Sequence, residues 1–157
     1  MIGDARRFTV RKGVGTSHVS PLNAFDKALM DAGIEDCNLI PVSSVLPPFI
    51  KETDEMPKNM GAFRPCVMAR AQGYGTDLMA GIRLGFREDG KGGYVVEKVS
   101  AGEDISRSGF NAMLEDMLDS MGSLRGVNMV NARSEIVELK MNQEAFGCAL
   151  VVLVYLP

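Results

Sequence analysis

The spacing of apolar side chains along the chain predicts two amphipathic helices among several strands. The first helix is expected to follow Ser20, which suits the N-cap, with Pro21 at the first helical position and Gly33 at the end. Its apolar residues recur at helical spacing at Leu22, Phe25, Ala28, Leu29 and Ala32. A second helix is predicted over residues 105–121, where the apolar positions also gather near one face.

Seven segments have the composition or alternation of strands. They are residues 7–12, 38–46, 62–72, 77–87, 94–99, 128–141 and 147–156. Residues 13–19 and 51–59 are expected to be loops, and Gly73–Thr76 is expected to be the turn of a hairpin. Helices in two separated places among runs of strand indicate an α+β layered sandwich in which each helix covers a sheet face.

Length and composition narrow the possible classes of protein. The chain has 157 residues, which predicts one domain over 1–157 with a single sizeable core. A net charge of −3 gives no electrostatic reason to expect a nucleic acid or an acidic membrane as partner. No apolar run approaches the roughly 18 residues of a membrane span, and the first residues lack the apolar region of a signal peptide, so a cytoplasmic location is expected.

Several common kinds of site are disfavoured. The three cysteines are far apart and odd in number, which indicates neither a disulfide framework nor a zinc site. The single histidine, His18, makes a Ser-His-Asp triad or a histidine-rich metal site improbable, so no metal is expected. There is no glycine-rich nucleotide-binding motif that opens a helix.

The adjacent hydroxyls of Ser43 and Ser44 are the strongest candidate for chemistry. In a rigid strand or turn, the hydroxyl of Ser44 can attack the carbonyl of Ser43 and convert the amide to an ester. Elimination then leaves a dehydroalanine, which hydrolyses to a pyruvoyl group. The alternative is a solvated pair of turn residues, which is common for this dipeptide.

Two carboxylates add to this candidate. The alternation of residues 94–99 places Glu97 between Val95 and Val99 on one face, where burial would raise its pKa as a proton donor requires. An edge position in which Glu97 leans toward solvent fits the same pattern. Asp26 lies on the border of the apolar stripe of the first helix, where it can reach a groove or simply favour the helix dipole.

Four segments together have a recognisable order and spacing, namely Pro21–Leu29, Ala32–Ile34, Asn38–Ile40 and Ser43–Pro48. In these segments the chain resembles the pyruvoyl-dependent arginine decarboxylases, whose signature has the same order and spacing. Weaker similarity follows in Met60–Ala62, Gly93–Glu97 and Gly147–Ala149.

The resemblance implies a fold, a cofactor and a set of roles. The fold would be a four-layer α/β/β/α sandwich with mostly antiparallel sheets, assembled as a homotrimer. Cleavage between Ser43 and Ser44 would give a β chain of residues 1–43 and an α chain of residues 44–157. Ser44 would become a covalent pyruvoyl group, with no metal and no PLP, and Asn38 would assist the processing.

The implied reaction converts L-arginine to agmatine and CO2 through a Schiff base on the pyruvoyl group. Glu97 would be the proton donor, and Asp26 would bind the guanidinium of the substrate. Two alternatives remain: the same machinery acting on another amino acid, and a non-catalytic, unprocessed relative that serves as an assembly subunit. The loop Thr16–Val19 and the turn Gly73–Asp77 differ from what the family predicts, and both differences concern the choice of substrate.

Overall fold

The computed structural model describes residues 4–157, which form two helices and nine strands. The elements in chain order are β1 (Arg7–Ser17), α1 (Pro21–Ala32), β2 (Asn38–Pro41), β3 (Val45–Leu46), β4 (Lys51–Glu52), β5 (Phe63–Tyr74), β6 (Leu78–Arg87), β7 (Gly93–Ala101), α2 (Arg107–Leu124), β8 (Met129–Leu139) and β9 (Phe146–Leu156). Within these residues, no helix is both long enough and apolar enough to cross a membrane.

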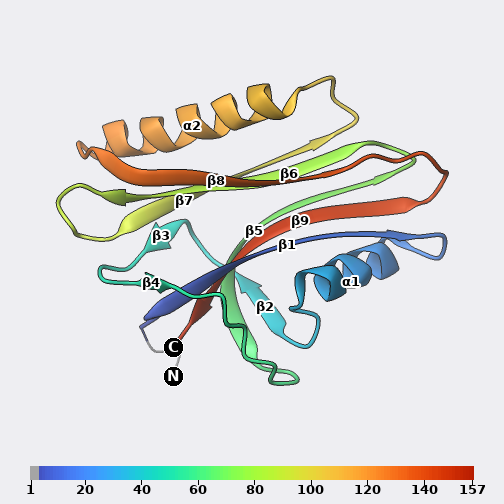
Figure 1. Cartoon of the computed structure of the whole chain (residues 1–157), viewed down its shortest axis with the longest axis horizontal. Coiled ribbons are helices and arrows are strands. Elements are labelled where there is room, and N and C mark those ends of the chain that lie inside the picture. Colours follow the sequence, from blue (N-terminus) through green and yellow to red (C-terminus); the bar gives the residue numbers. More distant parts are fainter. Residues whose placement is uncertain (1–3) are drawn as a thin grey trace.

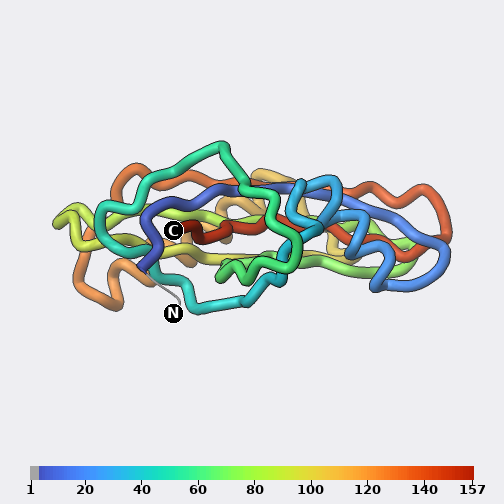
Figure 2. The backbone as a smooth tube through the Cα atoms, turned by 90° about the horizontal axis from the view of Figure 1, so that it is seen from below, coloured from blue at the N-terminus to red at the C-terminus, as the bar shows by residue number. Residues whose placement is uncertain are grey.

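The strands form two sheets. The first sheet has the order β2-β5-β9-β1-β4, and the second has the order β3-β7-β6-β8. Neighbouring strands are antiparallel except at the two edge pairs β1–β4 and β2–β5, which are parallel. In Figure 2, β1 and β9 run side by side along the long axis of the molecule, in agreement with their pairing from Arg7 opposite Leu156 to Ser17 opposite Phe146. The α+β fold with mostly antiparallel sheets is therefore confirmed.

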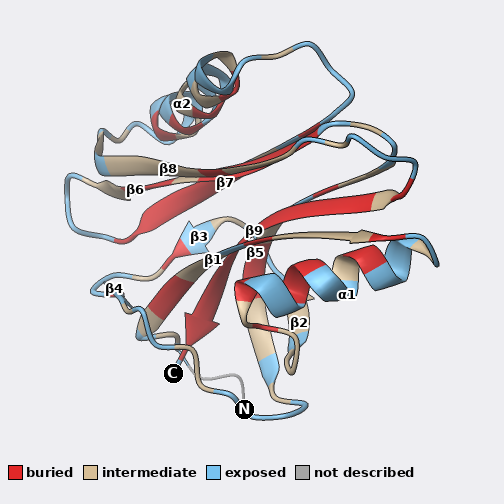
Figure 3. Cartoon of the chain, turned by 45° about the vertical axis from the view of Figure 1, so that its right-hand side comes forward, coloured by how far each residue is buried: buried red, intermediate tan, exposed pale blue. Residues whose placement is uncertain are grey.

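The two sheets pack face to face, with one helix on each outer face (Figure 1). The largest apolar cluster lies between the sheets and includes Val67, Ile82, Leu84, Val151 and Leu153. A second cluster lies between α1 and the first sheet, and a third lies between α2 and the second sheet. Figure 3 shows the buried side of each helix turned toward its sheet. The layers therefore follow the expected order, helix, sheet, sheet, helix.

The first helix has the predicted ends. Ser20 is the N-cap, and its hydroxyl oxygen accepts a hydrogen bond from the backbone N–H of Asn23 at 3.1 Å. Gly33 closes the helix in the left-handed conformation, with φ of 70°. The predicted apolar stripe is wrong at one position, because Leu22 is 72% exposed whereas Ala24 is buried.

The expected loop over residues 13–19 is wrong in its first part, because β1 continues to Ser17. Gly13 and Gly15 lie in this extension, directly under α1. A Cβ at Gly15 would lie 2.5 Å from the carbonyl oxygen of Ala24, and a Cβ at Gly13 would overlap the carbonyl of Ala28. The two glycines therefore allow the helix backbone to approach the strand closely, and they do not mark a turn.

Two further boundaries differ from the prediction. The polar segment 51–59 contains a short strand, β4, that pairs with the beginning of β1. The second helix covers residues 107–124 instead of 105–121, because Ser106 serves as its N-cap and accepts a hydrogen bond from Gly109 N–H at 3.0 Å.

The prediction of a single strand over residues 38–46 is wrong. Its first part is β2, which pairs with β5 in the first sheet, and its last part is β3, which pairs with β7 in the second sheet. Residues 42–44 cross from one sheet to the other. The segment is largely apolar although only Leu46 in it is buried, and composition alone does not show that its two ends pair with different sheets.

Candidate active site

Ser43 and Ser44 lie in the crossover between the two sheets. On one side of them, the N–H of Val42 donates a hydrogen bond to the carbonyl oxygen of Cys66 in β5 at 2.9 Å. On the other side, the N–H of Val95 in β7 donates to the carbonyl oxygen of Ser44 at 3.1 Å. The Ser43–Ser44 peptide bond therefore lies between two anchored residues, Val42 and Ser44, which are held by different sheets.

The backbone turns sharply at Ser44. The N–H of Val45 donates to the carbonyl oxygen of Ser43 at 3.1 Å, a contact between residues i and i+2 that is typical of a γ-turn. Ser43 is exposed and Ser44 is half-buried. The Ser43 carbonyl, which is the group that the Ser44 hydroxyl would attack, thus already accepts a hydrogen bond that withdraws electron density from its carbon.

Glu97 lies on β7, two residues beyond the Val95 that holds Ser44. The predicted alternation is confirmed, because Val95 belongs to the core between the sheets and Lys98 points to the other face, with its Nζ 5.8 Å from the ring centroid of Phe110 in α2. Glu97 is exposed in the single chain, and Val99 beside it is 41% exposed. The position is therefore at the rim of the core instead of inside it.

Partial removal of its carboxylate from water raises the pKa of Glu97. The negative charge of Glu97 also affects Cys66. Burial, and to a smaller extent this charge, raise the pKa of the Cys66 thiol to about 11. Because the carbonyl of Cys66 holds the crossover at Val42, Glu97 belongs to the same edge of the sandwich as the two serines.

Asn38 is the first residue of β2, whose last residue, Pro41, directly precedes the crossover. Its side-chain amide donates a hydrogen bond to the carbonyl oxygen of Gly61 at 2.9 Å. Among residues 4–157, no hydrogen bond joins Asn38 to Ser43 or Ser44. The structure of the single chain therefore ties Asn38 to the loop before β5, and a role in processing stays a prediction.

Asp26 is exposed on α1, which packs on β1, β9 and β5. Ser44 is hydrogen-bonded to β7, the strand that carries Glu97, and β7 belongs to the other sheet (Figure 1). Within one chain, the structure brings Ser43, Ser44 and Glu97 together and leaves Asp26 on the outer face of the first sheet.

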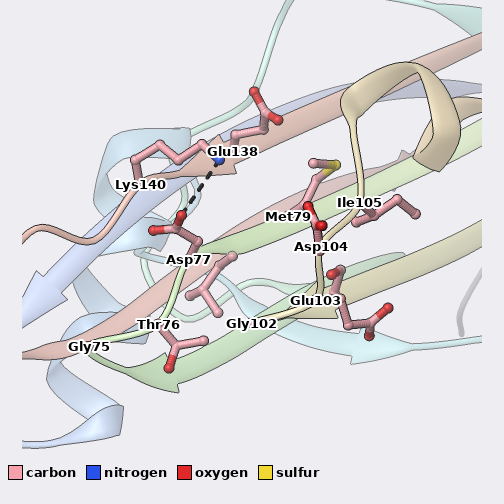
Figure 4. A pocket seen from close by; sticks show the side chains of 12 residues that line it. Gly75, Thr76, Asp77, Met79, Gly102, Glu103, Asp104, Ile105, Glu138 and Lys140 are labelled. Carbon is pink, nitrogen blue, oxygen red and sulfur yellow. Dashed lines mark ion pairs between the residues drawn. The ribbon is translucent and has the colours of Figure 1, made fainter.

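A cavity of about 540 Å³ opens at the other end of β7, away from the serines. It is lined by four acidic side chains and Lys140, whose Nζ lies 3.6 Å from Asp77 (Figure 4). None of the predicted site residues lines it. Among residues 4–157, no group of three or more His, Cys, Asp or Glu side chains is placed to hold a metal ion.

Sequence reasoning missed one residue at the crossover. The hydroxyl of Tyr155, in β9, donates a hydrogen bond to the carbonyl oxygen of Val45 at 2.8 Å. The only signal in the sequence is a single hydroxyl near the end of the apolar run Phe146–Leu156, and it gives no indication of the partner.

The family model for pyruvoyl-dependent arginine decarboxylase (PvlArgDC) matches residues 7–157. The chain belongs to this family. A pyruvoyl-dependent arginine decarboxylase of Methanopyrus kandleri is 30% identical over 154 residues, which cover 98% of this chain and 99% of the relative. Pyruvoyl-dependent arginine decarboxylase 2 of Archaeoglobus fulgidus is 34% identical over 134 residues, which cover 80% of this chain and 85% of the relative.

A solved structure supports the fold of this pyruvoyl-dependent decarboxylase. The structure of a pyruvoyl-dependent histidine decarboxylase matches 83% of this chain with a TM-score of 0.51 and 16% sequence identity, and the match spans 62% of the histidine decarboxylase chain. The resemblance drawn from the segment Pro21–Pro48 is thus confirmed, and so is the enzyme class.

Membership of the family implies a covalent pyruvoyl group, and the crossover fits one. A chain break between Ser43 and Ser44 would leave Val42 bound to β5 and Ser44 bound to β7, so both new ends would keep a backbone hydrogen bond. The half-buried position of Ser44 leaves such a group open to a small substrate.

Proposed function

We propose that this chain is a self-processing decarboxylase that converts L-arginine to agmatine and CO2 with a pyruvoyl group made from Ser44. The observation that carries the proposal is the Ser43–Ser44 crossover, anchored on both sides and with the Ser43 carbonyl already hydrogen-bonded, in a member of the arginine decarboxylase family.

Self-processing begins with the attack of the Ser44 hydroxyl on the Ser43 carbonyl carbon. The C–N bond breaks, an ester forms, and the hydroxyl proton passes to the freed nitrogen. Loss of the Ser44 Cα proton and cleavage of the Cβ–Oγ bond then release Ser43 as a carboxylate and leave a dehydroalanine. Its imine tautomer takes up water and releases ammonia. The products are chains of residues 1–43 and 44–157.

The pyruvoyl group supplies a ketone that condenses with the substrate amine and accepts the electrons released as CO2 departs. Because this electron sink is the role that PLP has elsewhere, the proposal requires neither PLP nor a metal. The chain's own contribution is to hold a proton at Glu97, whose raised pKa favours the protonated form, for transfer to the substrate carbon. We assign Asn38 to the processing step.

Asp26 would select the substrate. A carboxylate forms a two-point hydrogen-bonded pair with a guanidinium, which fixes a long basic amino acid by its far end. Since α1 lies apart from Ser44 within one chain, we propose that Asp26 acts in the site of a neighbouring copy in a homotrimer. Exposed apolar side chains support such an assembly, namely Val42 and Val45 at the crossover and Phe63 beside Asn38, which are 43%, 52% and 68% exposed.

Mass spectrometry of the purified protein tests the processing. We expect two fragments, residues 1–43 and a chain that begins with a pyruvoyl group at position 44, and an intact chain alone would contradict the proposal.

Light scattering tests the trimer. Asp26→Asn keeps the size of the side chain without its charge, and it should raise KM for arginine while fragment formation is unchanged.

Two alternatives have distinct outcomes. Assays with arginine, lysine, ornithine, histidine and aspartate would reveal the same machinery with another substrate, and agmatine formation from arginine alone would exclude it. A non-catalytic assembly subunit would stay uncleaved and would keep its biological effect in a Ser44→Ala variant.

A further inference from the structure

Tyr155 supports the crossover from the opposite sheet. Its ring belongs to the core between the sheets, is 7% exposed, and reaches from β9 in the first sheet to β3 in the second. The hydroxyl then donates to the carbonyl oxygen of Val45 at 2.8 Å, although the two residues are 110 positions apart in the chain. This contact is an addition to the pairing of β3 with β7.

Val45 is held at both of its backbone polar groups. Its carbonyl accepts from Tyr155, and its N–H donates to the carbonyl oxygen of Ser43 at 3.1 Å. The N–H of Val45 thus points back into the turn instead of out to a neighbouring strand. Fixing the carbonyl end of this residue also restricts the direction in which its N–H points.

We propose that Tyr155 is a positioning residue for self-cleavage, which holds Val45 so that its backbone N–H stabilises the negative charge that develops on the Ser43 oxygen. The inference rests on the proposed function, because it concerns the first step of the same processing reaction.

In the first step of cleavage, negative charge develops on the Ser43 oxygen, which is the atom that accepts the hydrogen bond from the Val45 N–H. When the Ser44 hydroxyl oxygen bonds to the Ser43 carbon, a five-membered ring closes and the carbonyl electron pair moves onto the Ser43 oxygen. Collapse of this species breaks the Ser43–Ser44 C–N bond, and the hydroxyl proton ends on the Ser44 nitrogen. A donor that is already aimed at the oxygen stabilises this charge without rearrangement.

The surroundings of Tyr155 suit a permanent donor. Burial, and secondarily the nearby Cys66, raise the pKa of Tyr155 to about 12, so the hydroxyl keeps its proton over the whole neutral range. Tyr155 does not touch the reacting atoms. Its effect passes through the backbone of Val45.

The variant Tyr155→Phe removes only the hydroxyl. We expect self-cleavage to be slower on the order of tenfold, the effect of one well-placed hydrogen bond, measured as loss of the intact chain by mass spectrometry. Decarboxylation per cleaved chain should equal that of the wild type. Tyr94→Phe is the matched control, because Tyr94 is 4% exposed and its hydroxyl also makes one hydrogen bond, with Arg87 at 3.2 Å on the α2 side of β7. This control should cleave at the wild-type rate even if its thermal stability falls equally.

Hydroxylamine identifies the step that is affected. It cleaves the ester as soon as the ester forms, so cleavage in its presence reports the first step alone. We expect Tyr155→Phe to remain slower than Tyr94→Phe with hydroxylamine present. Full recovery would place the defect in the elimination step and overturn the inference.

A second variant, Val45→Pro, removes the N–H itself on an edge strand, where proline is tolerated. It should cleave more slowly than Tyr155→Phe. Cleavage of either variant at the wild-type rate would overturn the role of Tyr155 and leave the proposed function intact. A wild-type chain that never cleaves would contradict the proposed function itself.

Discussion

The two long edges of the sandwich are closed in different ways. At one edge, β2 of the first sheet continues into β3 of the second through the Ser43–Ser44 peptide bond. At the other edge, β1 and β4 face β8, and two ion pairs connect the sheets, Lys12–Glu135 at 2.9 Å and Arg133–Glu52. Within β8, Arg133 also pairs with Glu135 at 2.6 Å.

The two edges would respond differently to the proposed cleavage between Ser43 and Ser44. At the edge where β2 continues into β3, here called the covalent edge, the chain is also held by hydrogen bonds to Cys66, Val95 and Tyr155. Cutting the peptide would therefore leave both β2 and β3 attached to their sheets. None of the residues to which the proposed reaction assigns a role lies at the charged edge, and its partly exposed ion pairs each contribute only about 0–1 kcal/mol. We therefore expect changes at the two edges to affect different properties.

Ser44→Ala should have the largest effect. Without the hydroxyl, neither the ester nor the pyruvoyl group can form, so mass spectrometry should show an intact chain and arginine turnover should fall to background. Thermal unfolding should occur at or above the wild-type temperature, because the covalent edge stays closed. Agmatine formation by this variant would show that Ser44 is not the source of the cofactor.

Glu97→Gln should lower arginine turnover but leave self-cleavage unchanged, although Glu97 and the two serines lie at the same edge. The amide keeps the shape of the side chain but cannot supply the proton, so kcat should fall by about 10²–10⁴-fold. Cleavage into fragments 1–43 and 44–157 should remain. Glu103→Gln, an exposed acid at the far end of β7, is the matched control and should leave kcat unchanged.

The raised pKa of Glu97 also predicts a pH dependence. The unfolded chain loses this proton near the ordinary glutamate pKa of about 4.3, whereas the folded chain keeps it to a higher pH. The contribution of Glu97 to stability is therefore full below the unfolded pKa and is lost as pH rises through the folded pKa. Unfolding curves of the wild type and Glu97→Gln should show the wild type losing stability relative to the variant over this interval.

Arg133→Met should act at the charged edge only. It removes both ion pairs of Arg133 but keeps the aliphatic length, so we expect a loss of about 1 kcal/mol in the free energy of unfolding, measured with denaturant. The rate of self-cleavage should not change. A slower cleavage would mean that the two edges are coupled through the core, contrary to the comparison.

Salt should give the smallest effect. At about 1 M salt the screening length falls to roughly 3 Å, so partly exposed pairs such as Lys12–Glu135 weaken. We expect the stability difference between the wild type and Arg133→Met to shrink toward zero. The ratio of cleavage rates of the wild type and Tyr155→Phe should stay constant, because the Tyr155 hydrogen bond is neutral and buried.

The sequence by itself determined the elements whose signals are local. Ser20, Pro21 and Gly33 define α1 because capping and proline geometry depend on neighbours within one turn. The apolar run of β9 likewise predicts a central, buried strand, and the motif from Asn38 to Pro48 indicates the family. These features require no knowledge of which segments meet in space.

Only the tertiary structure decided what depends on partners far away in the chain. Composition could not show that segment 38–46 divides between two sheets, because both of its ends are apolar and the choice of partner strand, β5 or β7, depends on residues far away in the chain. Glycine is needed at positions 13 and 15 because α1 packs closely over β1. The proposed role of Tyr155 depends on β9 lying opposite β3. Such contacts arise from the packing of the whole sandwich, which no local free energy encodes.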